Sequence, residues 1–157
     1  MIYVECKADF ALVKSVTKIP KREIVHELKG KGEVCNRLRK QGNCKGLVDE
    51  DPLSPQPSYI RKLRLENDLA HHELKVFYDQ SNKNYLIILC PSLEEWILKA
   101  AREANLNMEK YPLPDTRKKL HRALELERPL AKFEGLLEDL GDKGSERLKT
   151  LRKLLES

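Results

Sequence analysis

Gly46-Leu47-Val48-Asp49-Glu50-Asp51-Pro52 is the segment around which the predicted fold is organised. A short apolar run ends in three consecutive acids and is stopped by a proline, which predicts a buried strand that delivers carboxylates to its carboxyl end. Side chains two apart on a strand lie on the same side, so Asp49 and Asp51 project together and Glu50 projects to the other side. Two carboxylates placed in this way suit a divalent cation.

A second apolar run, Met1-Ile2-Tyr3-Val4, ends in the same manner at Glu5, and Asp9 follows one helical turn later. Carboxylates that converge in a folded core repel one another strongly unless they bind a metal or share protons. We therefore predict that these acids meet around Mg²⁺, for which Mn²⁺ can substitute.

The first half of the chain alternates strands and helices. Strands are predicted at 1–5, 22–28 and 45–49, with helices from Asp9, as N-cap, to about 20 and at 33–41. The crossovers are long enough for parallel pairing, which predicts an α/β fold with a doubly wound, mostly parallel sheet flanked by helices. The ligand site of such a sheet lies at the carboxyl ends of its strands.

The middle of the chain predicts a short helix within 59–69 and then a hairpin of strands 74–78 and 85–90. Ser92 begins the next helix, because Glu95 completes an S-x-x-E capping box. Glu94 lies in the first turn of that helix, at the strand-end edge where the other acids lie. It either joins the acidic site or complements the helix dipole.

Residues 111–157 carry amphipathic helical patterns, interrupted at Pro129 and again after Gly141 and Gly144. We predict an α/β domain over 1–110 and a helical C-terminal extension over 111–157. The extension either packs on the sheet or offers a surface to a protein partner.

Composition limits the classes of partner. The net charge is +5 with 35% charged residues, and the excess of basic residues falls mainly in the first 50 residues, which carry the acidic cluster. This balance is compatible with a nucleic-acid partner, DNA or RNA, and equally with a salt-bridged surface. Lys29-Gly30-Lys31-Gly32 is a basic loop that either contacts a phosphate or simply turns the chain, and its spacing is not that of a P-loop.

Cysteines and hydropathy indicate the compartment. The four cysteines show no zinc-ligand spacing, which predicts reduced thiols in a cytoplasmic protein. No apolar run approaches the roughly 20 residues that span a bilayer, so we expect no membrane association.

The order of the acidic motifs resembles the Toprim domain superfamily, found in topoisomerases, bacterial primases and some nucleases. The stretches that carry the likeness are Ile2-Tyr3-Val4-Glu5-Cys6-Lys7-Ala8-Asp9 and Leu47-Val48-Asp49-Glu50-Asp51. Within that superfamily, Pro91-Ser92-Leu93-Glu94 looks like the S-x-E element of the OLD (overcoming lysogenization defect) nucleases. The resemblance covers about residues 1–105.

The resemblance implies a role for each acid. Glu5 would be the acid/base residue or a ligand of the first metal, Asp49 and Asp51 would bind Mg²⁺, and Asp9 and Glu94 would complete a second metal position.

Toprim domains usually have Gly after the strand-end Glu, where this chain has Cys6. If that position required a positive φ, a cysteine would cost about 1 kcal/mol or more.

The expected function is that of a small stand-alone Toprim protein that binds Mg²⁺ and acts on phosphodiester bonds of nucleic acid as a nuclease. The alternative is a non-catalytic, Toprim-derived metal-binding or adaptor protein that uses its helical tail as a partner surface. A phosphatase of the haloacid-dehalogenase type is disfavoured. Its nucleophilic Asp belongs on the first strand, and its motif usually carries Thr or Val where this chain has Leu53.

Overall fold

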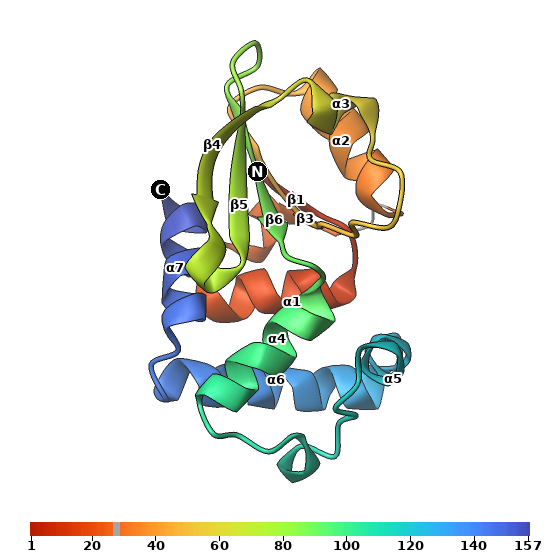
Figure 1. Cartoon of the computed structure of the whole chain (residues 1–157), viewed down its shortest axis with the longest axis vertical. Helices are drawn as coiled ribbons and strands as arrows, with labels where there is room; N and C mark the ends of the chain where they lie inside the picture. Colours follow the sequence, from red (N-terminus) through yellow and green to blue (C-terminus); the bar gives the residue numbers. More distant parts are fainter. Residues whose placement is uncertain (27–28) are drawn as a thin grey trace.

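In residues 1–26 and 29–157, which the computed structural model describes, six strands form one sheet in the order β2-β1-β3-β6-β5-β4 (Figure 1). Strands β2, β1, β3 and β6 run parallel, and β5 and β4 continue the sheet in antiparallel pairing. The predicted α/β class with a mostly parallel sheet is confirmed. The strands are β1 (Ile2–Val4), β2 (Ile24–Val25), β3 (Lys45–Asp49), β4 (Arg64–Leu69), β5 (Leu74–Asp79) and β6 (Asn84–Leu89).

The strand order reverses between β1 and β3. The chain leaves β1 for β2 on one side and returns to β3 on the other. The crossover connections therefore diverge at this point and leave a crevice outside the carboxyl ends of the two strands, the usual ligand position in open α/β sheets.

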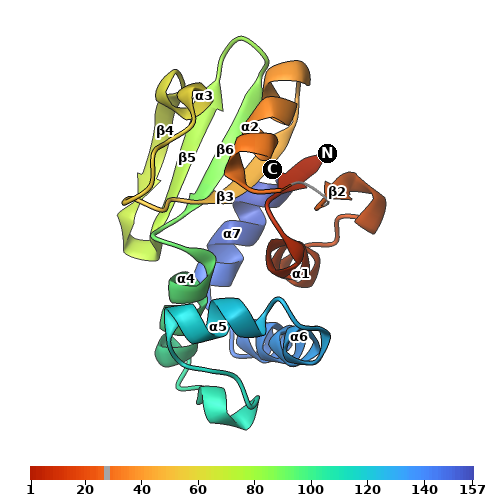
Figure 2. The ribbon, with the colours of Figure 1, turned by 90° about the vertical axis from the view of Figure 1, so that its right-hand side faces the viewer.

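Helices cover both faces of the sheet (Figures 1 and 2). Alternate side chains of β3 face opposite layers: Leu47 packs into a core shared with α1, α4, α6 and α7, and Val48 into a core shared with α2 and α3. The helices are α1 (Lys7–Val16), α2 (Lys31–Lys40), α3 (Ser58–Arg61), α4 (Leu93–Glu103), α5 (Arg117–Ala123), α6 (Glu127–Asp142) and α7 (Glu146–Glu156), with short 3₁₀ turns η1 (Lys21–Glu23), η2 (Ala70–His72) and η3 (Met108–Lys110).

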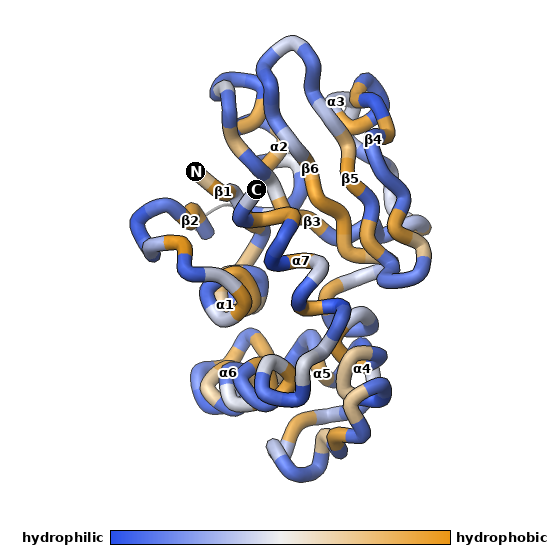
Figure 3. The backbone as a smooth tube through the Cα atoms, turned by 90° about the vertical axis from the view of Figure 1, so that its left-hand side faces the viewer, coloured by the Kyte–Doolittle hydropathy of each residue, from blue (hydrophilic) through white to orange (hydrophobic). Residues whose placement is uncertain are grey.

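Strand β6 is apolar along most of its length because both of its faces are covered (Figure 3). Leu86 and Ile88 contribute to the α2 side, whereas Ile87 and Leu89 contribute to the α1 side. Among the described residues, no helix combines the length and apolarity needed to cross a membrane.

The C-terminal helices share a hydrophobic core with the N-terminal half. Phe133 of α6 and Leu151 of α7 are completely buried, in the same cluster as Leu12 of α1 and Trp96 of α4. Helix α1 packs against both α6 and α7. The residues that follow position 110 therefore help to cover one face of the sheet, and the division at 110/111 stays a prediction.

The helix predicted within 59–69 is wrong over most of its length. Helix α3 ends at Arg61, and the following residues form β4. The sequence gives no alternating pattern here because β4 is an edge strand whose side chains are nearly all exposed. Backbone pairing with β5 defines the strand instead.

Other boundaries shift by a few residues. Helix α1 begins at Lys7, so Asp9 lies inside its first turn and is not the N-cap that was predicted. The strand predicted at 22–28 is limited to β2, and residues 27–28 lie outside the described part of the chain. Pro129 does not interrupt a helix, because it lies in the first turn of α6, where its missing amide proton costs nothing.

Candidate metal centre

The five predicted carboxylates lie at the carboxyl ends of three neighbouring strands. Glu5 follows β1 and Asp9 lies in the first turn of α1; Asp49 ends β3, with Asp51 two residues later; and Glu94 lies in the first turn of α4, after β6. Their charges act on one another. The charges of Glu5, Asp51 and Glu94 raise the pKa of Asp49, and the charges of Asp49 and Glu94 raise the pKa of Asp9. The structure therefore brings the whole set together at the switch point.

Burial and mutual repulsion both disfavour the charged forms. Burial, followed by the charge of Asp9, raises the pKa of Glu5 to about 8, and burial followed by the charge of Glu5 raises the pKa of Asp49 to about 8. Asp9 is only 1% exposed, and burial together with Asp49 raises its pKa well above the ordinary value. Without a cation, burial and mutual repulsion therefore favour the protonated forms of these groups.

Asp9 supplies an oxygen atom that is suited to a cation. Its Oδ2 accepts a hydrogen bond from the Cys6 thiol at 3.2 Å, but its buried Oδ1 has no hydrogen-bond partner among the described residues. A buried polar atom without a partner is costly, and a hard cation would satisfy it. The carboxylate set therefore fits Mg²⁺ in both ligand type and unmet bonding capacity.

The backbone at Cys6 is not strained. Cys6 has φ −156° and ψ 179°, which is ordinary extended backbone. The cost that a positive φ would have imposed does not arise here.

Helix α4 directs its amino end at Asp49. The backbone N–H of Leu93 donates to Asp49 Oδ1 at 2.9 Å, and the partial positive charge of the helix terminus favours an anion at that position. Ser92 is the N-cap, as predicted, since its side chain accepts from the backbone N–H of Glu95 at 3.3 Å. The sequence motif at Ser92 thus sets the position of α4 against the end of β3.

The loop after β3 turns its middle carboxylate away from the site. Glu50 Oε2 lies 2.7 Å from Lys75 Nζ on β5, so it projects to the other side as predicted. The extended geometry predicted for Asp51 is wrong, however, because β3 ends at Asp49. Asp51 adopts a left-handed backbone, φ 44°, and the Gln56 side chain holds this turn by donating to the carbonyl oxygens of Glu50 and Asp51 at 3.0 and 3.2 Å. Sequence analysis missed Gln56, because no local pattern distinguishes it from other loop residues.

The stretch predicted as a basic loop is helical from Lys31 onward, and Lys31 lies beside the acids. Lys31, the first residue of α2, donates to the carbonyl oxygen of Glu50 at 2.8 Å. Its charge also opposes the upward shift in the pKa of Glu5. The positively charged Lys31 side chain therefore lies next to the site, at the carboxyl end of β1.

Two further side chains reach the site from α5 and were also missed. His121 Nδ1 lies 2.7 Å from Glu94 Oε1, and Arg117 lies 3.6 Å from both Asp51 Oδ1 and Glu95 Oε1. The basic run of 117–122 is visible in the sequence, but only the packing of α5 against α4 places it here.

The site still needs rearrangement before it can hold an ion. In the described part of the chain, no three His, Cys, Asp or Glu side chains already form a ligand set. Glu94 is engaged by His121, and Asp51 by Arg117. Binding of a cation would therefore require side-chain rotation and release of Arg117.

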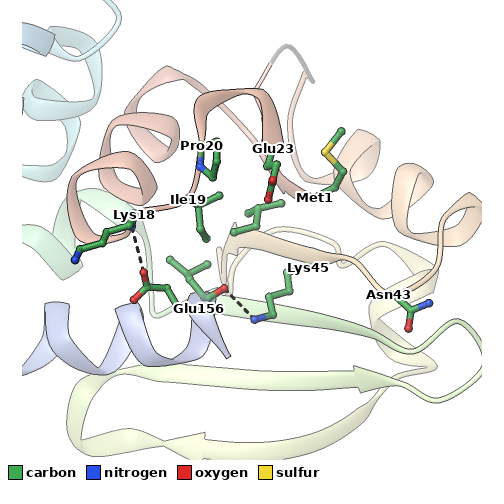
Figure 4. A pocket seen from close by; sticks show the side chains of 10 residues that line it. Met1, Lys18, Ile19, Pro20, Glu23, Asn43, Lys45 and Glu156 are labelled. Atoms are coloured by element: carbon green, nitrogen blue, oxygen red, sulfur yellow. Dashed lines mark hydrogen bonds between the residues drawn. The ribbon is translucent and has the colours of Figure 1, made fainter.

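Two hollows can be compared as approaches to substrate. A cavity of about 260 Å³ adjoins the carboxylates, between the first turn of α1 and α5, and is lined by Cys6, Lys7, Ala8, Glu94, His121, Leu124 and Glu125. A larger hollow lies at the opposite, amino-terminal edge of the strands (Figure 4). There Lys45 Nζ donates to the carbonyl oxygens of Leu154 and Leu155, both at 2.9 Å, and the backbone N–H of Lys18 donates to Glu156. Those contacts fix the end of α7. The described residues that line this hollow form no cluster of acids.

This chain matches no family model, no curated protein and no solved structure.

Proposed function

We propose that this chain is a Mg²⁺-dependent nuclease of the Toprim type, which acts on phosphodiester bonds of nucleic acid. The observation that carries the proposal is the convergence of five carboxylates from three strand ends, with the buried Asp9 Oδ1 lacking a partner in residues 1–26 and 29–157. The position of these groups at the switch point of the sheet supports a ligand site there.

The proposed ligands divide between two positions. Asp49 and Asp51, with Glu5, would hold one ion, and Asp9 and Glu94 would complete a second position. Mg²⁺, when bound, supplies positive charge that offsets the carboxylates and stabilises charge on phosphate oxygens, and Mn²⁺ has the same ligand preference.

Glu5 takes the acid/base role in this proposal. It is only partly buried, so its carboxyl can reach a bound substrate, whereas Asp9 and Glu94 are 1% and 5% exposed. Lys31 contributes a positive charge on the same side as Glu5, where it would attract a phosphate group.

The second candidate is a non-catalytic metal-binding or adaptor protein. The contacts of Arg117 with Asp51 and of His121 with Glu94 favour it, because two of the proposed ligands already have cationic or hydrogen-bonding partners from the chain itself. In that case the helical C-terminal segment would serve as a protein-binding surface.

The test is cleavage of single- and double-stranded DNA and RNA in the presence of Mg²⁺ or Mn²⁺. Asp49→Ala should abolish cleavage, whereas Asp142→Ala, which removes an exposed carboxylate at the end of α6, should leave it intact. Cleavage that is unchanged in Asp49→Ala would remove the proposed mechanism. Thermal stabilisation by Mg²⁺ without any cleavage would select the adaptor.

A further inference from the structure

Helix α5 is the most basic element near the carboxylates. Its seven residues, Arg-Lys-Lys-Leu-His-Arg-Ala, hold four Lys or Arg and one His but no acid. Leu120 is buried and fixes the helix to the core, and α5 packs against α4 (Figure 2). Every basic side chain of the helix is exposed.

Helical periodicity arranges these side chains in order of distance from the site. Arg117 and His121 are four residues apart, share one face, and contact Asp51 and Glu94. At about 100° per residue, Lys118 and Arg122 form the next row around the helix. The two rows together form a basic band that runs from the carboxylates toward solvent.

The row formed by Lys118 and Arg122 differs in its partners from the row formed by Arg117 and His121. Arg117 and His121 have acidic neighbours, but neither Lys118 nor Arg122 lies within 4 Å of an acidic side chain in residues 1–26 and 29–157. Their charges are therefore available to a ligand. Lys7, which lines the cavity opposite His121, adds a further exposed positive charge on the α1 side of the same approach.

We propose that α5 binds the phosphate backbone of a nucleic-acid strand whose reactive phosphate lies at the carboxylates, with Lys118 and Arg122 contacting the neighbouring phosphates. This inference rests on the proposed function for the identity of its ligand. A strand of phosphates fits both parts of this surface, because one phosphate can share a cation with the carboxylates while its neighbours pair with lysine and arginine. An acidic protein segment would match the basic band but would not require the cation site.

Binding without cleavage separates this inference from the nuclease proposal. Fluorescence anisotropy of labelled single-stranded DNA and RNA, measured in EDTA over a series of KCl concentrations, reports the phosphate contacts alone. The variant is Lys118→Gln/Arg122→Gln. The matched control is Lys149→Gln/Lys153→Gln, which removes two exposed charges with the same four-residue spacing from α7.

The α5 variant should weaken binding by at least about tenfold at low salt, and the slope of log K against log salt should fall by about 1.4, since each lost contact with a single strand removes about 0.7. The control should change binding by less than about threefold, and both variants should retain the thermal midpoint of the parent chain. Equal losses in the two variants, or no binding by the parent chain, would overturn the inference. Binding that depends on α5 without any cleavage would support the phosphate-binding role of α5 and refute the nuclease proposal. Cleavage that is unaffected in the α5 variant would support the nuclease proposal and refute the role of α5.

Discussion

The substitution Asp9→Asn tests whether the buried carboxylates are a cation site that is destabilising when no cation is bound. Asp9 is 1% exposed, its Oδ1 has no partner among the described residues, and the charges of Asp49 and Glu94 act on it. An amide of the same shape removes the cost that this carboxyl carries at neutral pH, which is either a buried charge or the uptake of a proton, and it can donate to a neighbouring carboxylate. In EDTA the variant should therefore be more stable than the parent chain.

The size of the effect follows from the cost of a buried polar group without a partner, about 1–3 kcal/mol. For a chain of this length, each kcal/mol shifts the thermal midpoint by roughly 2–4 °C, so we expect a rise of about 2–12 °C. A ligand present at a hundredfold excess over its dissociation constant stabilises a protein by about 2.7 kcal/mol. The parent chain should gain stability of that order in saturating Mg²⁺, and Asp9→Asn should lose most of the gain.

The assay is thermal unfolding followed by circular dichroism, in EDTA and across a MgCl₂ series at neutral pH. Asp142→Asn makes the same chemical change at an exposed position on α6 and should shift neither midpoint by more than the error of the measurement. The reasoning is refuted if Asp9→Asn is no more stable than the parent chain in EDTA and still gains the full Mg²⁺ stabilisation.

Three other properties follow from the structure. Because the pKa values of Glu5 and Asp49 are raised to about 8, the folded chain keeps protons that the unfolded chain releases near pH 4. In EDTA, the free energy of unfolding measured by urea titration should therefore fall as the pH rises from about 4 to about 8. Arg147→Met should lower the free energy of unfolding by about 1–3 kcal/mol. Its buried guanidinium donates to Glu73 and Glu103, but both acids remain partly solvated when it is removed. Gly46→Ala should lose about 1–3 kcal/mol by the same measurement, since the new Cβ would lie 2.9 Å from a methyl group of Leu38 in a packed core.

Each of these predictions has a matched control. Stability that rises with pH over the same window would contradict the raised pKa values, and saturating Mg²⁺ should flatten the profile. Arg152→Met, which breaks an exposed pair with Glu156, should cost less than about 1 kcal/mol. Gly135→Ala lies within α6 with nothing within 4 Å of the new Cβ, so it should stabilise the chain by up to about 1 kcal/mol. An Arg147 variant as stable as its control, or a tolerated Gly46→Ala, would show that these contacts do not hold the layers together.

Sequence patterns could predict the strands that are buried and the acids that follow them. The runs that became β3 and β6 are apolar because helices cover both faces, and the acids at their ends follow from chain order alone. Ser92 is a local signal of the same kind, since a helix N-cap depends on only a few residues. Strand β4 is the contrary case, because its identity depends on pairing with β5 and not on its own side chains.

The rest of the site depends on tertiary packing. Arg117 lies more than 60 residues from Asp51 in the chain, and His121 lies more than 20 residues from Glu94. No local pattern relates either basic residue to its acidic partner. The burial of Asp9 also depends on tertiary packing. The sequence suggests Asp9 as a helix cap, but the packing of α1 buries it beside the other carboxylates. The order of the acids along the chain was thus predictable, whereas their contacts with Arg117 and His121 were not.

A crystal structure of the chain soaked in Mn²⁺, with anomalous diffraction data, would show whether these carboxylates bind a metal ion. We expect an anomalous peak between Glu5, Asp49 and Asp51, with carboxylate oxygens about 2.1 Å from the ion. Arg117 should have moved away from Asp51 in that structure. The absence of a peak at saturating Mn²⁺, with Arg117 still beside Asp51, would show that these carboxylates are not a metal site.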